Sequence, residues 1–87
     1  MTRTREHFRY ELKDGRQVVY IGITNDPEAR EQEHFDAGKR FSHLLVVGPA
    51  VTRDTAEGWD EDRLAAYRRS HGGRNPRYNK TETGGLL

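Results

Sequence analysis

The 87-residue chain lacks cysteine altogether. Neither a disulfide framework nor a thiolate metal site can therefore form, and because the composition fits a reducing compartment we expect the protein to be cytoplasmic. Long apolar runs are missing too: none approaches the roughly 18 residues that a membrane span needs. The polar and basic segment 1–9 has no apolar centre like that of a signal peptide. We therefore expect no membrane association.

Apolar residues are scarce. They make up 32% of the chain, against 33% for charged residues, so any hydrophobic core is small. The apolar residues nevertheless gather in strand-like and helix-like groups, which a disordered chain would not show. We expect one domain over residues 1–87, with its core over 8–79 and a flexible tail over 80–87.

Acidic residues almost disappear towards the C-terminus. The net charge is only +1 at pH 7, but residues 63–87 hold six basic residues and one acidic residue. A basic stripe of this kind is typical of a phosphate-binding surface. The side chains that we expect to contact nucleic acid are Arg68, Arg69, Arg74, Arg77 and Lys80.

An alternating pattern near the N-terminus predicts a β-hairpin. Its apolar residues are Phe8, Tyr10 and Leu12, which alternate with charged ones. Asp14-Gly15 follows, a pair typical of type I′ turns, and residues 17–23 are expected to form the second strand. Strict alternation places Val18 and Tyr20 on one face of that strand and Val19 on the other. Because both faces carry apolar residues, we expect both to be covered.

A helix is predicted after the hairpin. Asp26 is the expected N-cap and Pro27 the first helical residue. The helix should end near Ala37, before Gly38. Its apolar face is weak, so packing alone does not explain its orientation.

A third strand and a second helix complete the expected elements. Leu44–Val47, inside segment 42–48, is a continuous apolar run typical of a buried strand. The second helix is expected over 56–70, after the polar stretch 52–55. Its apolar residues span an arc of about 160° at 100° per residue. They are Ala56, Trp59, Leu64, Ala66 and Tyr67. Glu61 lies just outside this arc, where a carboxylate is both held and reachable.

The order of these elements and motifs resembles the GIY-YIG nuclease family over about residues 8–79. The second motif of the family is intact as Tyr20-Ile21-Gly22. The first is degenerate: Phe8-Arg9-Tyr10 stands where Gly-Ile-Tyr is usual, and only the tyrosine is kept.

Further single residues match the same family. Arg30 and His34, at i and i+4 on one helix face, match its Arg and His. Glu61 matches its metal-binding glutamate, although the neighbouring Asp60 and Asp62 leave a shift of one residue open, and Asn79 matches its terminal asparagine. Each match is weak by itself, whereas all of them in the right order form a specific pattern.

The resemblance implies an α/β (α+β) fold, with a three-stranded antiparallel sheet flanked by helices in the order β-β-α-β-α. It also implies hydrolysis of a DNA phosphodiester bond at a single metal ion. Glu61 would hold Mg²⁺ or Mn²⁺, which few protein ligands and several waters usually coordinate.

Each remaining matched residue has a chemical role in such a reaction. Tyr10 is the expected base or water-positioning group, with Tyr20 facing it across the strand pair as its orienting partner. Arg30 would clamp the phosphate, and His34 would relay a proton or bind phosphate. Asn79 would tie the C-terminal segment back to the site. A tyrosine pKa is ordinarily about 10, so a tyrosine base needs help from its surroundings.

Two other functions are compatible with the residues. One is a non-catalytic nucleic-acid-binding module on the same fold, which the degenerate first motif favours. The other is a protein-interaction domain that docks a partner on the acidic surface of the first helix. Because almost nothing lies outside the nuclease-like core, target selection would come from the core, from a homodimer or from a targeting partner protein. We expect weak sequence specificity or structure-selective cutting.

Overall fold

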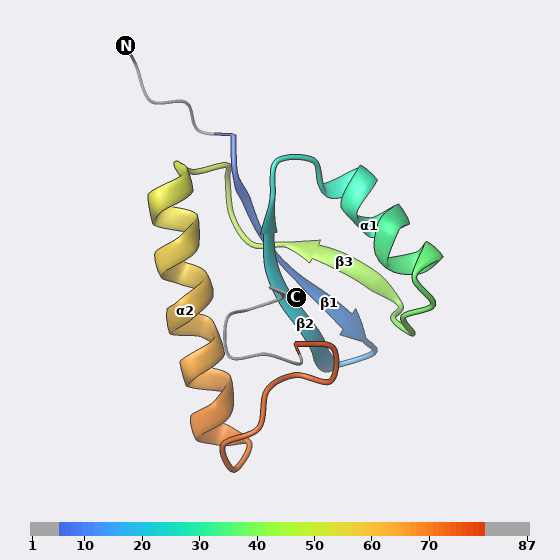
Figure 1. Cartoon of the computed structure of the whole chain (residues 1–87), viewed down its shortest axis with the longest axis vertical. Helices are drawn as coiled ribbons and strands as arrows, with labels where there is room; N and C mark the ends of the chain where they lie inside the picture. The colour runs from blue at the N-terminus through green and yellow to red at the C-terminus, as the bar shows by residue number, and fades with distance from the viewer. Residues whose placement is uncertain (1–5, 80–87) are drawn as a thin grey trace.

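The computed structural model describes residues 6–79. In chain order its elements are β1 (Phe8–Asp14), β2 (Gln17–Thr24), α1 (Pro27–Asp36), β3 (His43–Val46) and α2 (Arg53–Ser70). The fold is a small α+β domain with a three-stranded antiparallel sheet and two helices, as the sequence predicts (Figure 1). The flexible tail expected over 80–87 lies outside the described residues. In the described part of the chain, no helix is long and apolar enough to cross a membrane.

The first strand of the hairpin, β1, is the central strand of the sheet, because the strand order is β2-β1-β3. Gly15 in its turn has a φ of +64°, and no other residue type among 6–79 has a positive φ. A positive φ at the first central residue alone is the signature of a type II′ turn. The expected type I′ turn is therefore wrong, although the hairpin itself is confirmed.

A β-bulge in β2 changes which side chains share a face. Leu12 pairs with Tyr20, but the next residue, Lys13, pairs with Val18, so Val19 has no partner of its own. An extra residue reverses the alternation beyond it. The predicted face pattern is therefore wrong: Val18 lies opposite Tyr20, and Val19 shares the side of Tyr20.

Two apolar clusters cover the two faces of the sheet. On one face, Val18 and Ile21 of β2 pack against Leu64 and Tyr67 of α2. On the other face, which α1 adjoins, the buried residues are Tyr10, Leu12 and Val19. Figure 1 shows α2 along one side of the sheet and α1 on the other. The expectation that β2 is covered on both faces is thus confirmed.

The third strand is less buried than its sequence suggests. Leu45 is 43% exposed and Val46 is 37% exposed, because β3 is an edge strand that pairs with β1 on one side only. The prediction of a buried strand is wrong here. A short apolar run does not distinguish an edge strand from a central one.

The helix boundaries follow the capping chemistry. Asp26 accepts a hydrogen bond from the Ala29 N–H at 3.2 Å, and Pro27 opens α1, as predicted. The predicted start of α2 is wrong by three residues. Thr52 is its N-cap and Arg53 its first residue, so the polar stretch before residue 56 is the first turn rather than a linker.

The segment after α2 returns to the free edge of β2. The Tyr78 N–H donates to the Val19 carbonyl at 2.8 Å. The Asn79 side chain accepts from the Ile21 N–H at 2.8 Å and donates to the Ile21 carbonyl at 2.9 Å. These bonds replace a neighbouring strand and cover an edge that would otherwise expose its main-chain groups.

Candidate active site

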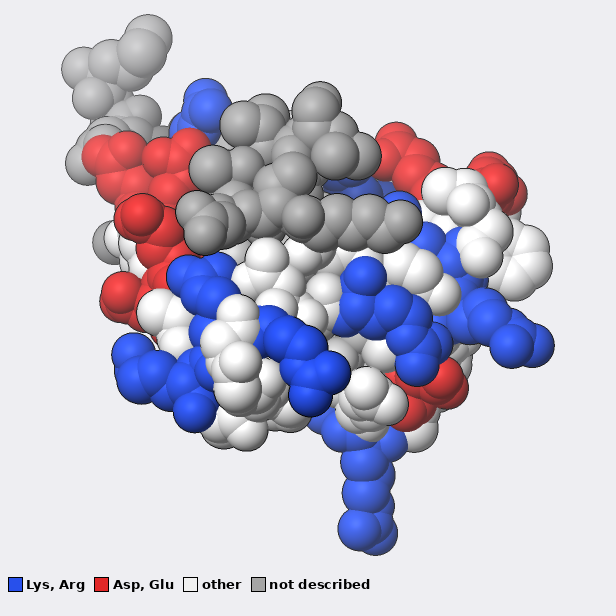
Figure 2. Space-filling model, turned by 60° about the horizontal axis from the view of Figure 1, so that its bottom comes forward, with Lys and Arg blue, Asp and Glu red and all other residues white. Residues whose placement is uncertain are grey.

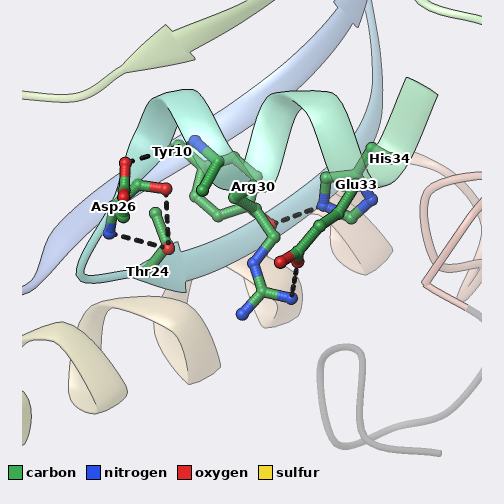
Figure 3. Close-up of polar contacts among 7 residues, drawn as sticks. Tyr10, Thr24, Asp26, Arg30, Glu33 and His34 are labelled. Atoms are coloured by element: carbon green, nitrogen blue, oxygen red, sulfur yellow. Dashed lines mark hydrogen bonds and ion pairs between the residues drawn. The ribbon is translucent and has the colours of Figure 1, made fainter. Parts of the chain in front are cut away.

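Three aromatic side chains from β1, β2 and α1 meet on one face of the sheet. The Tyr10 hydroxyl lies 2.8 Å from Nε2 of His34, and both side chains are buried (Figure 3). The rings of Tyr10 and Tyr20 stack with their centroids 5.9 Å apart, and the Tyr20 ring is 4.7 Å from the His34 ring. Three of the residues singled out in the sequence are therefore direct neighbours.

Gly22 makes room for the two tyrosines. Tyr10 pairs with Gly22 and Tyr20 pairs with Leu12, so the tyrosines are diagonal neighbours rather than the directly opposed pair expected. A Cβ atom at Gly22 would lie 2.7 Å from Cε1 of Tyr20 and 2.8 Å from the Tyr10 hydroxyl oxygen. Such contacts are too short for carbon, so the site needs a residue without a side chain at this position.

Burial keeps the cluster uncharged at neutral pH. It raises the pKa of Tyr10 and of Tyr20, because a phenolate would lose its hydration. Burial also lowers the pKa of His34 to about 4, and the positive charges of Lys39 and Arg30 act in the same direction. His34 is then a neutral imidazole, and its Nε2 atom shares a hydrogen bond with the Tyr10 hydroxyl, which Tyr10 donates in the tautomer that carries the proton on Nδ1.

Arg30 brings a positive charge to the tyrosines. Its charge lowers the pKa of both Tyr10 and Tyr20, against the effect of burial. The guanidinium pairs with Glu33 at 3.2 Å, and both partners are exposed (Figure 3). An exposed pair of this kind contributes about 0–1 kcal/mol. A phosphate can therefore displace Glu33 and accept the planar donors of Arg30.

A carboxylate from α2 acts on the same tyrosines, and it belongs to Asp60. Its negative charge raises the pKa of Tyr10 and of Tyr20. The pKa of Asp60 itself rises to about 6, mainly through burial and also through the charge of Glu61. Its Oδ1 atom is buried without a hydrogen-bond partner among residues 6–79. Glu61, the carboxylate singled out in the sequence, is exposed and lines a surface hollow with Arg68.

The helical period of the sequence also bears on the position of Asp60. Asp60 lies four residues after Ala56 and four before Leu64, and both of these are buried. Residues at that spacing share a helix face. Asp60 is thus near the centre of the buried arc of α2, whereas Glu61 lies at its margin. The assignment of the metal to Glu61 stays a prediction, and Asp60 is a second candidate on the same helix.

Asn79 lies outside the aromatic cluster but fixes one of its strands. Its side chain is 1% exposed, and both of its bonds go to Ile21, the residue between Tyr20 and Gly22. It is therefore placed to act as a positioning residue, through the strand that carries Tyr20.

The basic residues singled out in the sequence are spread over the C-terminal part of the domain. Arg68 and Arg69 lie in the last turn of α2, where Arg68 donates to the Asn75 side chain at 2.8 Å. Arg74 is exposed in the segment that follows. That these residues contact nucleic acid stays a prediction.

Arg77 belongs to a second basic group that the sequence did not reveal. It lines a surface hollow together with Lys39 and Arg40, which follow α1. Figure 2 views the molecule from the end where α2 finishes and shows more Lys and Arg than acidic side chains on that surface. The remaining expected contact, Lys80, lies outside the described residues.

Comparison of the chain with protein-family models, with curated proteins and with solved structures found no match. The resemblance to the GIY-YIG nucleases therefore depends on the residues discussed above. Family membership, activity, metal and nucleic-acid partner remain predictions.

Proposed function

We propose that the protein is a GIY-YIG-type endonuclease that hydrolyses a DNA phosphodiester bond with the help of one divalent metal ion. The observation that carries the proposal is the buried bond of 2.8 Å between the Tyr10 hydroxyl and Nε2 of His34. Arg30 and Asp60 add a cation and a carboxylate whose charges act on Tyr10. A proton acceptor, a fixed cation and a metal ligand are the groups that this hydrolysis requires.

The Tyr10–His34 pair provides a route for the proton of the attacking water. As the water oxygen attacks phosphorus, Tyr10 accepts a proton from the water and passes its own proton to Nε2 of His34. In the Nδ1–H tautomer the neutral imidazole has a lone pair on Nε2 that can accept it, although burial lowers the pKa of His34 to about 4 and makes it a weak base. Tyr10 then never exists as a separate phenolate, which burial disfavours. Negative charge developing on the phosphate stabilises the new imidazolium.

Arg30 and Tyr20 complete the reacting surface. Arg30 donates to the phosphate oxygens, where charge increases in the transition state. Tyr20 stacks on Tyr10 and limits the directions in which its hydroxyl can point. Gly22 leaves the space that both rings need.

The residues present fit a hard divalent cation. The Oδ1 atom of Asp60, which is buried and has no hydrogen-bond partner among the described residues, is a suitable ligand. A single carboxylate suits Mg²⁺ or Mn²⁺, because these ions keep several waters and bind substrate phosphate. The ion, when bound, would neutralise phosphate charge and favour departure of the leaving oxygen.

A nicking assay on supercoiled plasmid tests both the activity and the metal ligand. The purified protein should nick plasmid with Mg²⁺ or Mn²⁺ and stop when EDTA is added. Asp60→Asn should lower the rate by at least about 100-fold, a loss typical of a metal ligand or acid–base group. Glu61→Gln is its matched control and should cut at nearly the wild-type rate. The opposite ranking would return the metal to Glu61.

A nucleic-acid-binding module without catalysis is the second candidate. The basic hollow lined by Lys39, Arg40 and Arg77 favours it, because that surface does not need the tyrosine cluster to bind phosphate. This candidate prevails if the protein binds DNA with a steep salt dependence but cuts no DNA substrate with either metal.

A further inference from the structure

Phe35 is the most exposed large apolar side chain in the described part of the chain. It is 67% exposed in the last turn of α1, directly after His34. It contributes little to the core, so the fold does not explain an aromatic residue there. An exposed aromatic ring beside a reacting centre is a possible contact for a flat ligand.

The surroundings of Phe35 on one side are basic. Phe35 lines a surface hollow with Phe41, and the charged residues around it are Lys39, Arg40, Arg77 and a single acid, Asp14. Three cations against one carboxylate attract an anionic ligand. Aromatic rings between cations form the usual combination of groups that bind single-stranded nucleic acid.

A neighbouring hollow that Phe35 also lines is acidic. Its lining includes Glu28, Glu31 and Gln32 of α1. A polyanion is repelled from that hollow and attracted to the side of Lys39 and Arg40. The charges thus favour one approach to the ring.

Lys39 connects the basic hollow with the aromatic cluster of the active site. Its Nζ atom is 5.9 Å from the ring centroid of Tyr20 and 6.0 Å from that of Tyr78. The Tyr78 hydroxyl in turn accepts a hydrogen bond from the Arg40 N–H at 2.8 Å. A strand bound in the hollow therefore lies beside the tyrosines rather than on a distant surface.

We infer that Phe35 is a stacking platform for an unpaired nucleobase, with Lys39, Arg40 and Arg77 holding the adjacent phosphates. This inference deepens the proposed endonuclease function and rests on it. It assigns the substrate class: DNA that has a single-stranded segment next to the bond to be cut, such as a flap or an open end. In a continuous duplex the faces of the bases are stacked on each other and cannot reach Phe35.

Fluorescence anisotropy of the full-length chain with a labelled oligo(dT) tests the platform without requiring cleavage. Phe35→Leu keeps an apolar side chain but removes the ring, and it should weaken oligo(dT) binding by about 5- to 100-fold, the range for loss of one base-stacking contact. Phe35→Tyr should retain the wild-type affinity. Leu45→Ala, at an exposed apolar position of β3, is the control and should bind normally. All four proteins should bind a blunt duplex of the same length equally.

The outcomes separate this inference from the proposed chemistry. If Phe35→Leu binds oligo(dT) as tightly as the wild type, or loses duplex affinity equally, the platform is refuted even if plasmid is nicked. If the ring-dependent preference for single strands appears but no substrate is cut, the platform stands and the hydrolytic function fails. Equal cutting of flap and blunt duplex by the wild type would also overturn the substrate assignment.

Discussion

The hydrogen bonds between Asn79 and Ile21 should contribute measurably to the free energy of unfolding. They are 2.8 and 2.9 Å long, and the Asn79 side chain is 1% exposed. Alanine at position 79 leaves the N–H and the carbonyl of Ile21 without their partners at a site that water barely reaches. Leaving a buried polar group unpaired costs about 1–3 kcal/mol. Since water can enter part of the space left by the side chain, we expect the free energy of unfolding to fall by about 2–4 kcal/mol in total.

That loss is large for a chain of this size. A domain of 87 residues has a free energy of unfolding of about 4–13 kcal/mol. Its entropy of unfolding is about 0.18 kcal/mol/K, so the melting temperature should fall by about 10–20 °C. Thermal unfolding followed by far-UV circular dichroism measures this shift directly.

Asn25→Ala is the matched control for this experiment. Asn25 is exposed in the turn before α1, and its replacement should change the free energy of unfolding by less than about 0.5 kcal/mol. If Asn79→Ala melts within about 2 °C of Asn25→Ala, the two bonds do not hold the edge of β2. The positioning role of Asn79 would then be refuted as well.

Two further predictions concern the aromatic cluster. Gly22→Ala should lower the free energy of unfolding by about 1–3 kcal/mol, because the added Cβ overpacks against the Tyr10 hydroxyl. Gly58→Ala should raise it by about 0.5–1 kcal/mol, because its Cβ would meet nothing within 4 Å in α2. Denaturant titration of both variants measures the difference, and equal shifts would contradict the prediction. His34 has its pKa lowered to about 4 by burial, so its neutral form adds stability above pH 6.5 that is lost as the pH falls through 4, by at most about 3 kcal/mol. Between pH 4 and 6.5 the free energy of unfolding should fall more steeply with decreasing pH for the wild type than for His34→Gln. An equal pH dependence would show that His34 is not buried as a neutral imidazole.

The local sequence was sufficient to predict most of the secondary-structure elements. The turn at Gly15 and the cap at Asp26 depend on a few neighbouring residues, so the hairpin and the first helix could be placed from sequence. The bulge at Val19 could not, because it depends on which residues of β1 lie opposite β2. The exposure of β3 was missed for a similar reason: its apolar run fits a buried strand, and only the strand order makes it an edge.

The candidate site shows the same division between local and long-range information. Tyr10, Tyr20 and His34 could be selected by motif, but the hydrogen bond and ring contacts among them depend on the tertiary fold. The helical period places Asp60 on the buried arc of α2, but the effect of its charge on Tyr10 depends on the tertiary fold. Lys39 could not be found, because its approach to Tyr20 depends on how the chain turns after α1.

The Tyr10→Phe variant tests the central claim most directly, because it removes one hydroxyl oxygen and keeps the ring that packs in the core. The measurement is the rate of a single round of plasmid nicking with saturating protein and Mg²⁺, after circular dichroism has shown that the variant is folded. Loss of a group that transfers the proton of the attacking water typically costs about 100- to 10,000-fold, and we predict a decrease in that range, with DNA affinity unchanged. A Tyr10→Phe protein that nicks as fast as the wild type, or a wild type that cuts neither plasmid nor a DNA flap, would contradict the account.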